Sequence, residues 1–167
     1  VSLFNKFRPG DHNIVAAVSD KHENTKLYSH HTNSPVQTIN KATSNKKNYL
    51  DSSVTEIKTQ TLNSIIENSP FSEKKIDLLS IDIEGNEYKA LKNFKFEKYK
   101  PSLVIVEFND LNLIELEFFY QDFNTVLKSK IFDLFRSNGY RFVNWHHADL
   151  IFVSEEIYNK RNLYKLE

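Results

Sequence analysis

The alternation of apolar and polar residues divides the chain into strands and helices. Seven short apolar or alternating segments predict strands: residues 13–18, 25–28, 54–59, 76–82, 102–108, 140–145 and 149–153. Residues 25–28 should form a hairpin with what precedes them, and the last two strands should form a closing antiparallel hairpin. Helices are predicted at residues 61–68, 88–94 and 124–138, the last with apolar residues at helical spacing and a glycine C-cap at Gly139.

This order of elements predicts an α/β fold with a mostly parallel sheet. Strands that alternate with helices are joined by right-handed crossovers, which place the strands side by side and parallel. The run Leu103–Val106 lacks polar alternation, which is typical of a strand covered on both faces. We expect a single domain over residues 1–167, since this length suits one core. Residues 30–53 are mostly polar and predict a long surface loop.

Composition excludes several classes of function. The chain has 22 basic and 22 acidic residues, so it lacks the positive charge with which nucleic-acid-binding proteins displace counterions. Its longest apolar runs fall far short of the roughly 20 residues that span a membrane, and its N-terminus does not resemble a signal peptide. The absence of cysteine excludes disulfides and thiolate chemistry and suits a reducing compartment. We therefore expect a soluble, cytoplasmic protein that binds neither nucleic acid nor membrane.

Two further absences affect the interpretation. The chain begins at Val1, contains no methionine and has only three glycines. The missing methionine indicates a piece of a longer protein. Three glycines in 167 residues are far fewer than the about 7 % of an average protein. A site that depends on a glycine-rich loop must therefore be missing or lie outside these residues.

Acidic residues follow two neighbouring strands of the predicted sheet. Asp82 and Glu84 come after one strand, and Glu107 with residues 109–110 closes the next. Ligands of open α/β sheets bind at the carboxyl ends of parallel strands, and carboxylates there suit a cation, a hydroxyl that must lose a proton, or a hard metal ion. Alternatively, Asp82 and Glu84 only stabilise the start of the following helix. Gly85 favours the ligand site, because glycine permits close backbone approach or a left-handed turn.

Histidines form a second group of candidates. His146 and His147 join the last two strands, and if the first of these runs parallel to the sheet, the turn lies at the same edge as Asp82 and Glu107. Either imidazole could then act as a general base. Otherwise both are exposed turn residues, as we also expect for residues 30–31.

Three segments together resemble the FkbM family of methyltransferases. The run 76–92 contains Asp-Ile-Glu-Gly-Asn-Glu after a strand, residues 100–108 give Lys-Pro-Ser-Leu-Val-Ile-Val-Glu-Phe, and Ala16-Ala-Val-Ser-Asp20 precedes Lys26-Leu-Tyr28. The family consists of S-adenosylmethionine-dependent O-methyltransferases on the Rossmann-like class I fold. The resemblance therefore implies that fold, that cofactor, and an acceptor hydroxyl on a small molecule or glycan.

The chain departs from the family at its N-terminus. Family members begin with a strand and a glycine-rich turn that holds the methionine part of the cofactor, and a second strand ends in a glutamate that binds the ribose. Neither motif is present here, since Gly10 is the single glycine among residues 1–12. The chain thus resembles the C-terminal two-thirds of such a domain, with its N-terminal strands missing. In the family those two strands lie between the first strand present here and the strand 76–82. We expect their loss to open the centre of the sheet and destabilise it.

The resemblance also implies roles for individual residues. Asp82 would lie at the methyl-transfer centre, in contact with acceptor or cofactor, with Glu84 and Glu107 lining the acceptor pocket. Asp20 would lie near the adenine end of the cofactor, and Gly85 beside the cofactor. We include His146 among the catalytic candidates and assign no residue to a metal, although an acidic edge leaves Mg²⁺ as an alternative.

Two other functions remain open from the sequence. The missing glycine-rich turn would suit a non-catalytic Rossmann-like segment that serves as an interaction module. A nicotinamide-dependent dehydrogenase shares the fold class but needs a glycine fingerprint that is also missing.

Overall fold

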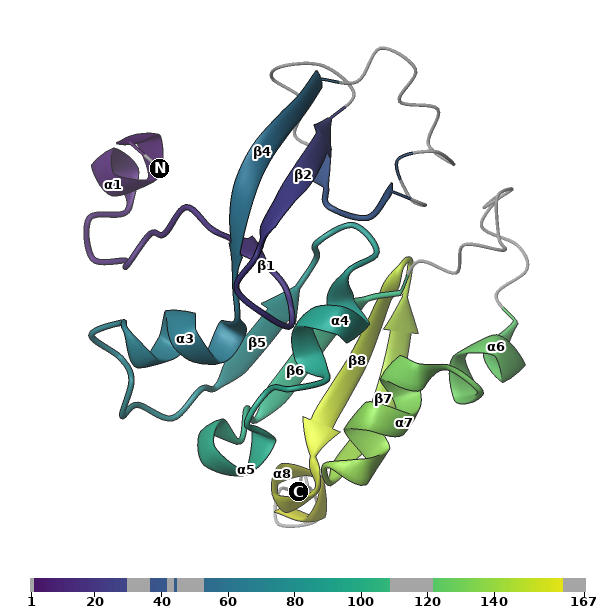
Figure 1. Cartoon of the computed structure of the whole chain (residues 1–167). Helices are drawn as coiled ribbons and strands as arrows, with labels where there is room; N and C mark the ends of the chain where they lie inside the picture. Colours follow the sequence, from purple (N-terminus) through teal and green to yellow (C-terminus); the bar gives the residue numbers. More distant parts are fainter. Residues whose placement is uncertain (1, 30–36, 42–43, 45–52, 109–121, 161–167) are drawn as a thin grey trace.

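Two four-stranded sheets form the framework of the molecule (Figure 1). The computed structural model describes residues 2–29, 37–41, 44, 53–108 and 122–160. Most of the predicted polar loop 30–53 and the candidate residues 109–110 lie outside the described residues, as do His30 and His31.

The first sheet combines one parallel and two antiparallel pairings. Its strands are β1 (Ala17–Val18), β2 (Asn24–Ser29), β3 (Gln37–Thr38) and β4 (Ser53–Gln60), in the order β1-β4-β2-β3. β1 pairs parallel with β4, and β2 pairs antiparallel with β4 and β3. The prediction that residues 25–28 pair with what precedes them is therefore wrong. β1 has only two residues, whereas β4 is long enough to pair with all six residues of β2.

The second sheet contains the central strands of the chain. Its strands are β5 (Leu78–Ile81), β6 (Leu103–Glu107), β7 (Tyr140–His146) and β8 (Asp149–Ser154), in the order β5-β6-β8-β7. β5 and β6 are parallel, whereas β8 runs antiparallel to both of its neighbours. The closing hairpin β7–β8 is thus confirmed.

The predicted mostly parallel sheet is wrong. Of the six strand pairings among the described residues, two are parallel and four are antiparallel. Within the second sheet helices connect β5 to β6 and β6 to β7, but β8 returns from β7 through a tight turn and lies between β6 and β7, so it pairs antiparallel with both. The molecule is a mixed α/β protein with two mixed sheets.

Short helices connect and cover the strands. They are α1 (Ser2–Phe7), α3 (Leu62–Glu67), α4 (Glu87–Leu91), α5 (Phe96–Tyr99), α6 (Phe123–Leu127), α7 (Lys130–Ser137) and α8 (Glu155–Lys160). The helix predicted at 124–138 is divided in two, because the Ser129 side chain accepts a hydrogen bond from the Phe132 N–H and starts α7. Gly139 follows α7 with φ +77°, as the predicted C-cap requires.

The apolar core lies on one face of the second sheet. Alternate residues of β6 and β8, such as Val104, Val106 and Phe152, are fully buried beneath α4, α5 and α7 (Figure 1). Leu103 and Ile105 on the other face are only half-buried, and Leu78 in β5 is 51 % exposed. The predicted coverage of both faces is therefore wrong for this strand. Apolar residues on both faces of a strand allow both faces to be buried, but only the face that packs against helices is fully buried here.

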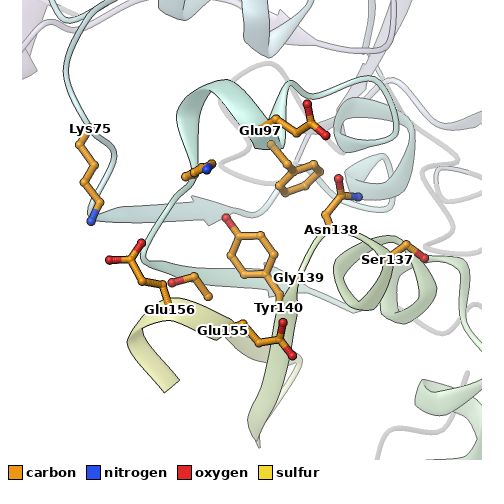
Figure 2. Close-up of a pocket in the computed structure, with 11 residues that line it drawn as sticks. Lys75, Glu97, Ser137, Asn138, Gly139, Tyr140, Glu155 and Glu156 are labelled. Carbon is orange, nitrogen blue, oxygen red and sulfur yellow. The ribbon is translucent and has the colours of Figure 1, made fainter. Parts of the chain in front are cut away.

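Tyr140 lies at the start of β7 (Figure 2) and is hydrogen-bonded to the segment before β6. Its hydroxyl donates to the Pro101 carbonyl at 2.8 Å, and burial raises the pKa of Tyr140 to about 12, so the donor stays protonated. Tyr140→Phe leaves that carbonyl without this donor and should lower the free energy of unfolding by about 1 kcal/mol. Urea denaturation measures the loss, with Tyr88→Phe at a 39 % exposed position as the control. Equal losses in the two variants would contradict this role.

Candidate functional site

A tight turn carries the predicted acidic residues from β5 into α4. We call Asp82–Asn86 the acidic turn. Glu84 and Gly85 both adopt left-handed backbone angles, with φ +56° and +86°. Gly85 adopts this conformation without steric cost, which agrees with the predicted left-handed turn. Glu84 has a Cβ atom, so its conformation costs roughly 1–2 kcal/mol and needs support from its neighbours.

The first sheet holds the acidic turn from outside. The Thr38 hydroxyl donates to the Glu84 carbonyl at 2.8 Å, and the Asn40 side-chain amide donates to the Gly85 carbonyl at 2.9 Å. The Asn86 side chain in turn donates to the Val18 carbonyl at the end of β1. The acidic turn is therefore the point at which the two sheets are joined by hydrogen bonds.

Three carboxylates meet beside this turn. Asp82, Glu87 and Glu107 each bring an oxygen to within 4.8 Å of the others. Asp82 is exposed, Glu107 is half-buried and Glu87 is only 6 % exposed. Burial raises the pKa of Glu87, against the opposing effect of hydrogen bonds from its own backbone, from Ile83 and Gly85, and from Glu107. Burial therefore favours the protonated, uncharged form of Glu87, and the side chain of Glu107 is hydrogen-bonded to it.

Glu87 is the site residue that the sequence did not single out. The signal was present, because Glu87 ends the Asp-Ile-Glu-Gly-Asn-Glu motif. Because Glu87 stands at the start of a predicted helix, however, its negative charge is already explained by the favourable interaction of an acidic residue with the helix N-terminus. Oxygen ligands so close together are also the type that Mg²⁺ binds, but such carboxylate groups are common in proteins without a metal.

The alternative role of Asp82 and Glu84 as helix stabilisers finds no support. The N-cap of α4 is Asn86, which makes no side-chain capping bond, and the acidic residue in its first turn is Glu87. Asp82 and Glu84 instead line a cavity of about 440 Å³. Its other walls are mainly apolar and come from the first sheet and the segments beside it, with Ile83 from the acidic turn: Val15, Ala16, Ala17, Val18, Leu27, Ile39, Ile57 and Ile83.

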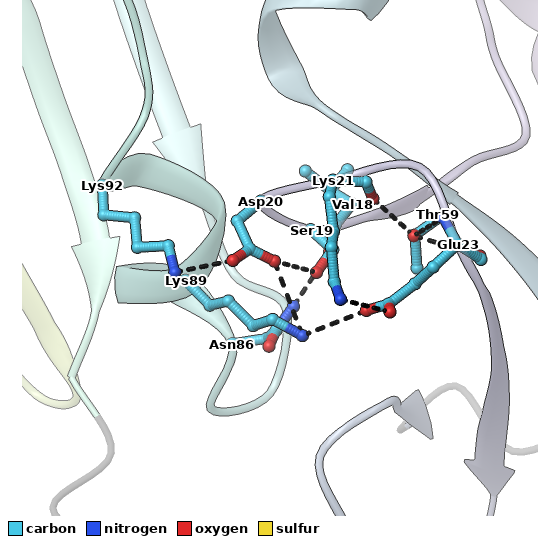
Figure 3. A network of polar contacts seen from close by, with 9 residues as sticks. All are labelled: Val18, Ser19, Asp20, Lys21, Glu23, Thr59, Asn86, Lys89 and Lys92. Atoms are coloured by element: carbon cyan, nitrogen blue, oxygen red, sulfur yellow. Dashed lines mark hydrogen bonds and ion pairs between the residues drawn. The ribbon is translucent and has the colours of Figure 1, made fainter.

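Asp20 lies in a network of charges between β1 and α4 (Figure 3). Its carboxylate contacts Lys92 at 2.6 Å and Lys89 at 3.6 Å, and it accepts a hydrogen bond from the Ser19 hydroxyl. Lys89 also contacts Glu23 at 3.6 Å. Lys89 of α4 and Lys92, the residue that follows α4, thus compensate the charge of the Asp20 side chain, which is 13 % exposed. Its role at the adenine end of a cofactor stays a prediction.

The pairing of Asp20 predicts a pH dependence. The hydrogen bond from Lys92 is the main cause that lowers the pKa of Asp20 below its usual 3.8. The stabilisation is therefore fully present above pH 3.8 and is lost as pH falls through the folded-state pKa. Asp20→Asn should lower the free energy of unfolding at pH 7 by up to about 1 kcal/mol, because the lysines are partly exposed. The loss should shrink as the pH falls below 3.8; urea denaturation measures it, and exposed Asp77→Asn is the control.

The histidine turn lies at the same edge of the second sheet as the acidic residues. β7 runs in the same direction as β5 and β6, which fulfils the condition set by the sequence. Asp149 pairs with both Glu107 and His146, so β8 separates these two residues by two strand spacings, about 10 Å. His146 and His147 are exposed, with ring centroids 4.2 Å apart.

Comparison with known proteins identifies one family. The profile of the methyltransferase FkbM domain matches residues 4–142. The comparisons with curated proteins and with solved structures found no match. Among the described residues, no helix is long and apolar enough to cross a membrane.

Proposed function

Because the chain belongs to the FkbM methyltransferase family, we propose that it is an S-adenosylmethionine-dependent O-methyltransferase acting on a hydroxyl of a small molecule or glycan. The observation that carries this proposal is the position of Asp82. It belongs to a group of three close carboxylates and also lines the cavity between the first sheet and the acidic turn. A hydroxyl in that cavity would meet a carboxylate that can accept its proton.

Asp82 is the residue of this group best placed for proton transfer. Glu87 is buried, Glu107 is hydrogen-bonded to it, and neither of them lines the cavity. Asp82 is exposed and would orient the acceptor hydroxyl and take its proton as the new oxygen–methyl bond forms. Glu84 would line the same pocket. His146 would lie farther along the edge, as a second general-base candidate.

The described residues fit only part of the cofactor. When bound, S-adenosylmethionine supplies an electrophilic methyl group on a positively charged sulfur. The carboxylates of Asp82 and Glu84 beside apolar walls suit that cation. The sequence has no glycine-rich turn for the methionine portion, since its glycines are Gly10, Gly85 and Gly139. We therefore assign to Asp82 and Glu84 the binding of the sulfonium group and of the acceptor, and we assign no residue to the methionine portion.

Calorimetric titration with S-adenosylhomocysteine tests the proposal. We expect saturable binding, and Asp82→Asn should alter its enthalpy, whereas Asp77→Asn on the exposed start of the same segment should not. Absence of binding to the 167-residue chain and also to a version extended upstream would contradict the enzyme and favour the interaction module. Binding by the extended version alone would support a methyltransferase domain of which this chain carries the acceptor side.

A further inference from the structure

The acidic turn needs support, because one of its two left-handed residues is not glycine. Glu84 has φ +56°, a conformation that residues with a Cβ atom rarely adopt. Such a conformation persists only where surrounding contacts fix it. The contacts around this turn therefore identify the residues that set the direction of Asp82 and Glu84.

Glu87 supports the acidic turn from inside. One oxygen of its carboxylate, Oε1, accepts hydrogen bonds from the backbone N–H of Ile83 at 3.0 Å and of Gly85 at 3.1 Å. These two donors flank Glu84, so the chain is wrapped around a single acceptor atom. Glu87 is also the first residue of α4, where Ala90 and Leu91 belong to the buried core. The acceptor atom therefore belongs to a helix that packs into the buried core.

Thr38 and Asn40 support the same turn from outside through the carbonyls of Glu84 and Gly85. Thr38 is 1 % exposed, and its hydroxyl also accepts a hydrogen bond from the Asn40 N–H at 2.9 Å. The N–H groups of Ile83 and Gly85 thus donate to Glu87, and the carbonyls of Glu84 and Gly85 accept from Thr38 and Asn40 beside the first sheet. Removing either side would release Glu84 from its left-handed conformation.

We propose that Glu87 is a positioning residue whose buried carboxylate fixes the acidic turn in the conformation that presents Asp82 and Glu84 to the cavity. This inference rests on the proposed function for its effect on ligand binding. The geometric part is independent of it, because the turn is held in the same way whatever the cavity binds.

A matched pair of variants separates hydrogen bonding from charge. Glu87→Gln keeps an oxygen that can accept both N–H groups, whereas Glu87→Ala removes the acceptor. In Glu87→Ala, amide hydrogen exchange at Ile83 and Gly85 should be at least about tenfold faster than in the original chain. In Glu87→Gln it should change by less than about threefold. Exposed Glu97→Gln is the control, and equal exchange in Glu87→Ala and the original chain would overturn the proposal.

Ligand binding separates positioning from general stability. At a temperature where all variants are folded, Glu87→Ala should bind S-adenosylhomocysteine at least about tenfold more weakly, and Glu87→Gln should restore the affinity. Unchanged affinity in folded Glu87→Ala would overturn the positioning role. If the original chain binds no S-adenosylhomocysteine, the proposed function fails, and hydrogen exchange alone then supports or overturns the geometric part.

A second pair of variants covers the case in which Glu87→Ala does not fold. Thr38→Val removes the donor to the Glu84 carbonyl at nearly constant volume, and Thr38→Ser keeps it. Faster exchange at Gly85 in Thr38→Val, with normal exchange in Thr38→Ser, would support a turn held from both sides. Identical exchange in both variants would show that the turn does not need the Thr38 hydrogen bond and would overturn its support from outside.

Discussion

Urea unfolding of the 167-residue chain should show two separate transitions, with the first sheet lost before the second. Trp145, the single tryptophan, lies in β7, so its fluorescence reports on the second sheet only. Far-ultraviolet circular dichroism reports on the strands of both sheets. The dichroism signal should therefore begin to fall at roughly 1–2 M lower urea than the fluorescence, which corresponds to a local stability difference of about 2–3 kcal/mol.

The reason for this difference is the uneven distribution of the core. The buried apolar cluster is built from the second sheet and its helices, with Leu62 from α3 as the main addition. The buried side chains of the first sheet are polar, such as Ser29, Thr38 and Thr59. Apolar burial is the main source of folding free energy, so the first sheet depends on its hydrogen bonds and on the acidic turn.

Open strand edges add to the weakness. β1 and β5 each end their sheet in the strand order of the described residues. Near them, Val15 is 74 % exposed and Leu78 51 %, and the apolar residues of α1, among them Phe7, are also exposed. Unpaired edges beside exposed apolar side chains favour association, so aggregation should increase with protein concentration.

Amide hydrogen exchange provides an independent test of the lower stability of the first sheet. Amides in β2 and β4 should exchange faster than those in β6 and β8, because only the latter pair lies over the buried cluster. A single cooperative transition, coincident by fluorescence and dichroism and at an ordinary midpoint, would contradict both the uneven core and the partial domain inferred from the sequence.

Local signals predicted the elements better than their pairing. The apolar runs located β5, β6, β7 and β8, and Gly139 marked the end of α7, because burial and capping act over a few residues. The pairing of β2 with β4 depends on contacts more than twenty residues apart, for which the sequence carries no local signal. The segment 13–18 shows the same limit: it is apolar enough for a strand, but only Ala17–Val18 has a partner.

The sequence predicted those residues of the candidate site that lie at the carboxyl ends of neighbouring parallel strands. Asp82 and Glu107 meet because β5 and β6 are parallel neighbours, and both residues lie at their carboxyl ends. The role of Glu87 could not be predicted, because it depends on a turn that folds back onto its side chain. The ion pairs of Asp20 with Lys89 and Lys92 join segments about seventy residues apart, and for that reason the sequence did not reveal them.

Asp82→Asn should have the largest effect on activity. Loss of a positioned proton acceptor typically lowers the rate 10²- to 10⁴-fold, and Asn keeps the size of the side chain while removing its basicity. The measurement is transfer of a labelled methyl group from S-adenosylmethionine to a panel of oligosaccharides and small-molecule alcohols. Affinity for S-adenosylhomocysteine should change much less than the transfer rate, because the acceptor hydroxyl is the group that Asp82 serves.

Two matched variants decide whether Asp82 acts alone. Glu107→Gln changes a half-buried carboxylate that is hydrogen-bonded to Glu87 and does not line the cavity, so it should lower the transfer rate less than Asp82→Asn does. His146→Gln changes a residue about 10 Å from Glu107 across the sheet. If Asp82 accepts the proton, His146→Gln keeps most of the activity. If Asp82→Asn retains more than about a tenth of the rate and His146→Gln loses it, the histidine is the general base, and Asp82 only orients the acceptor.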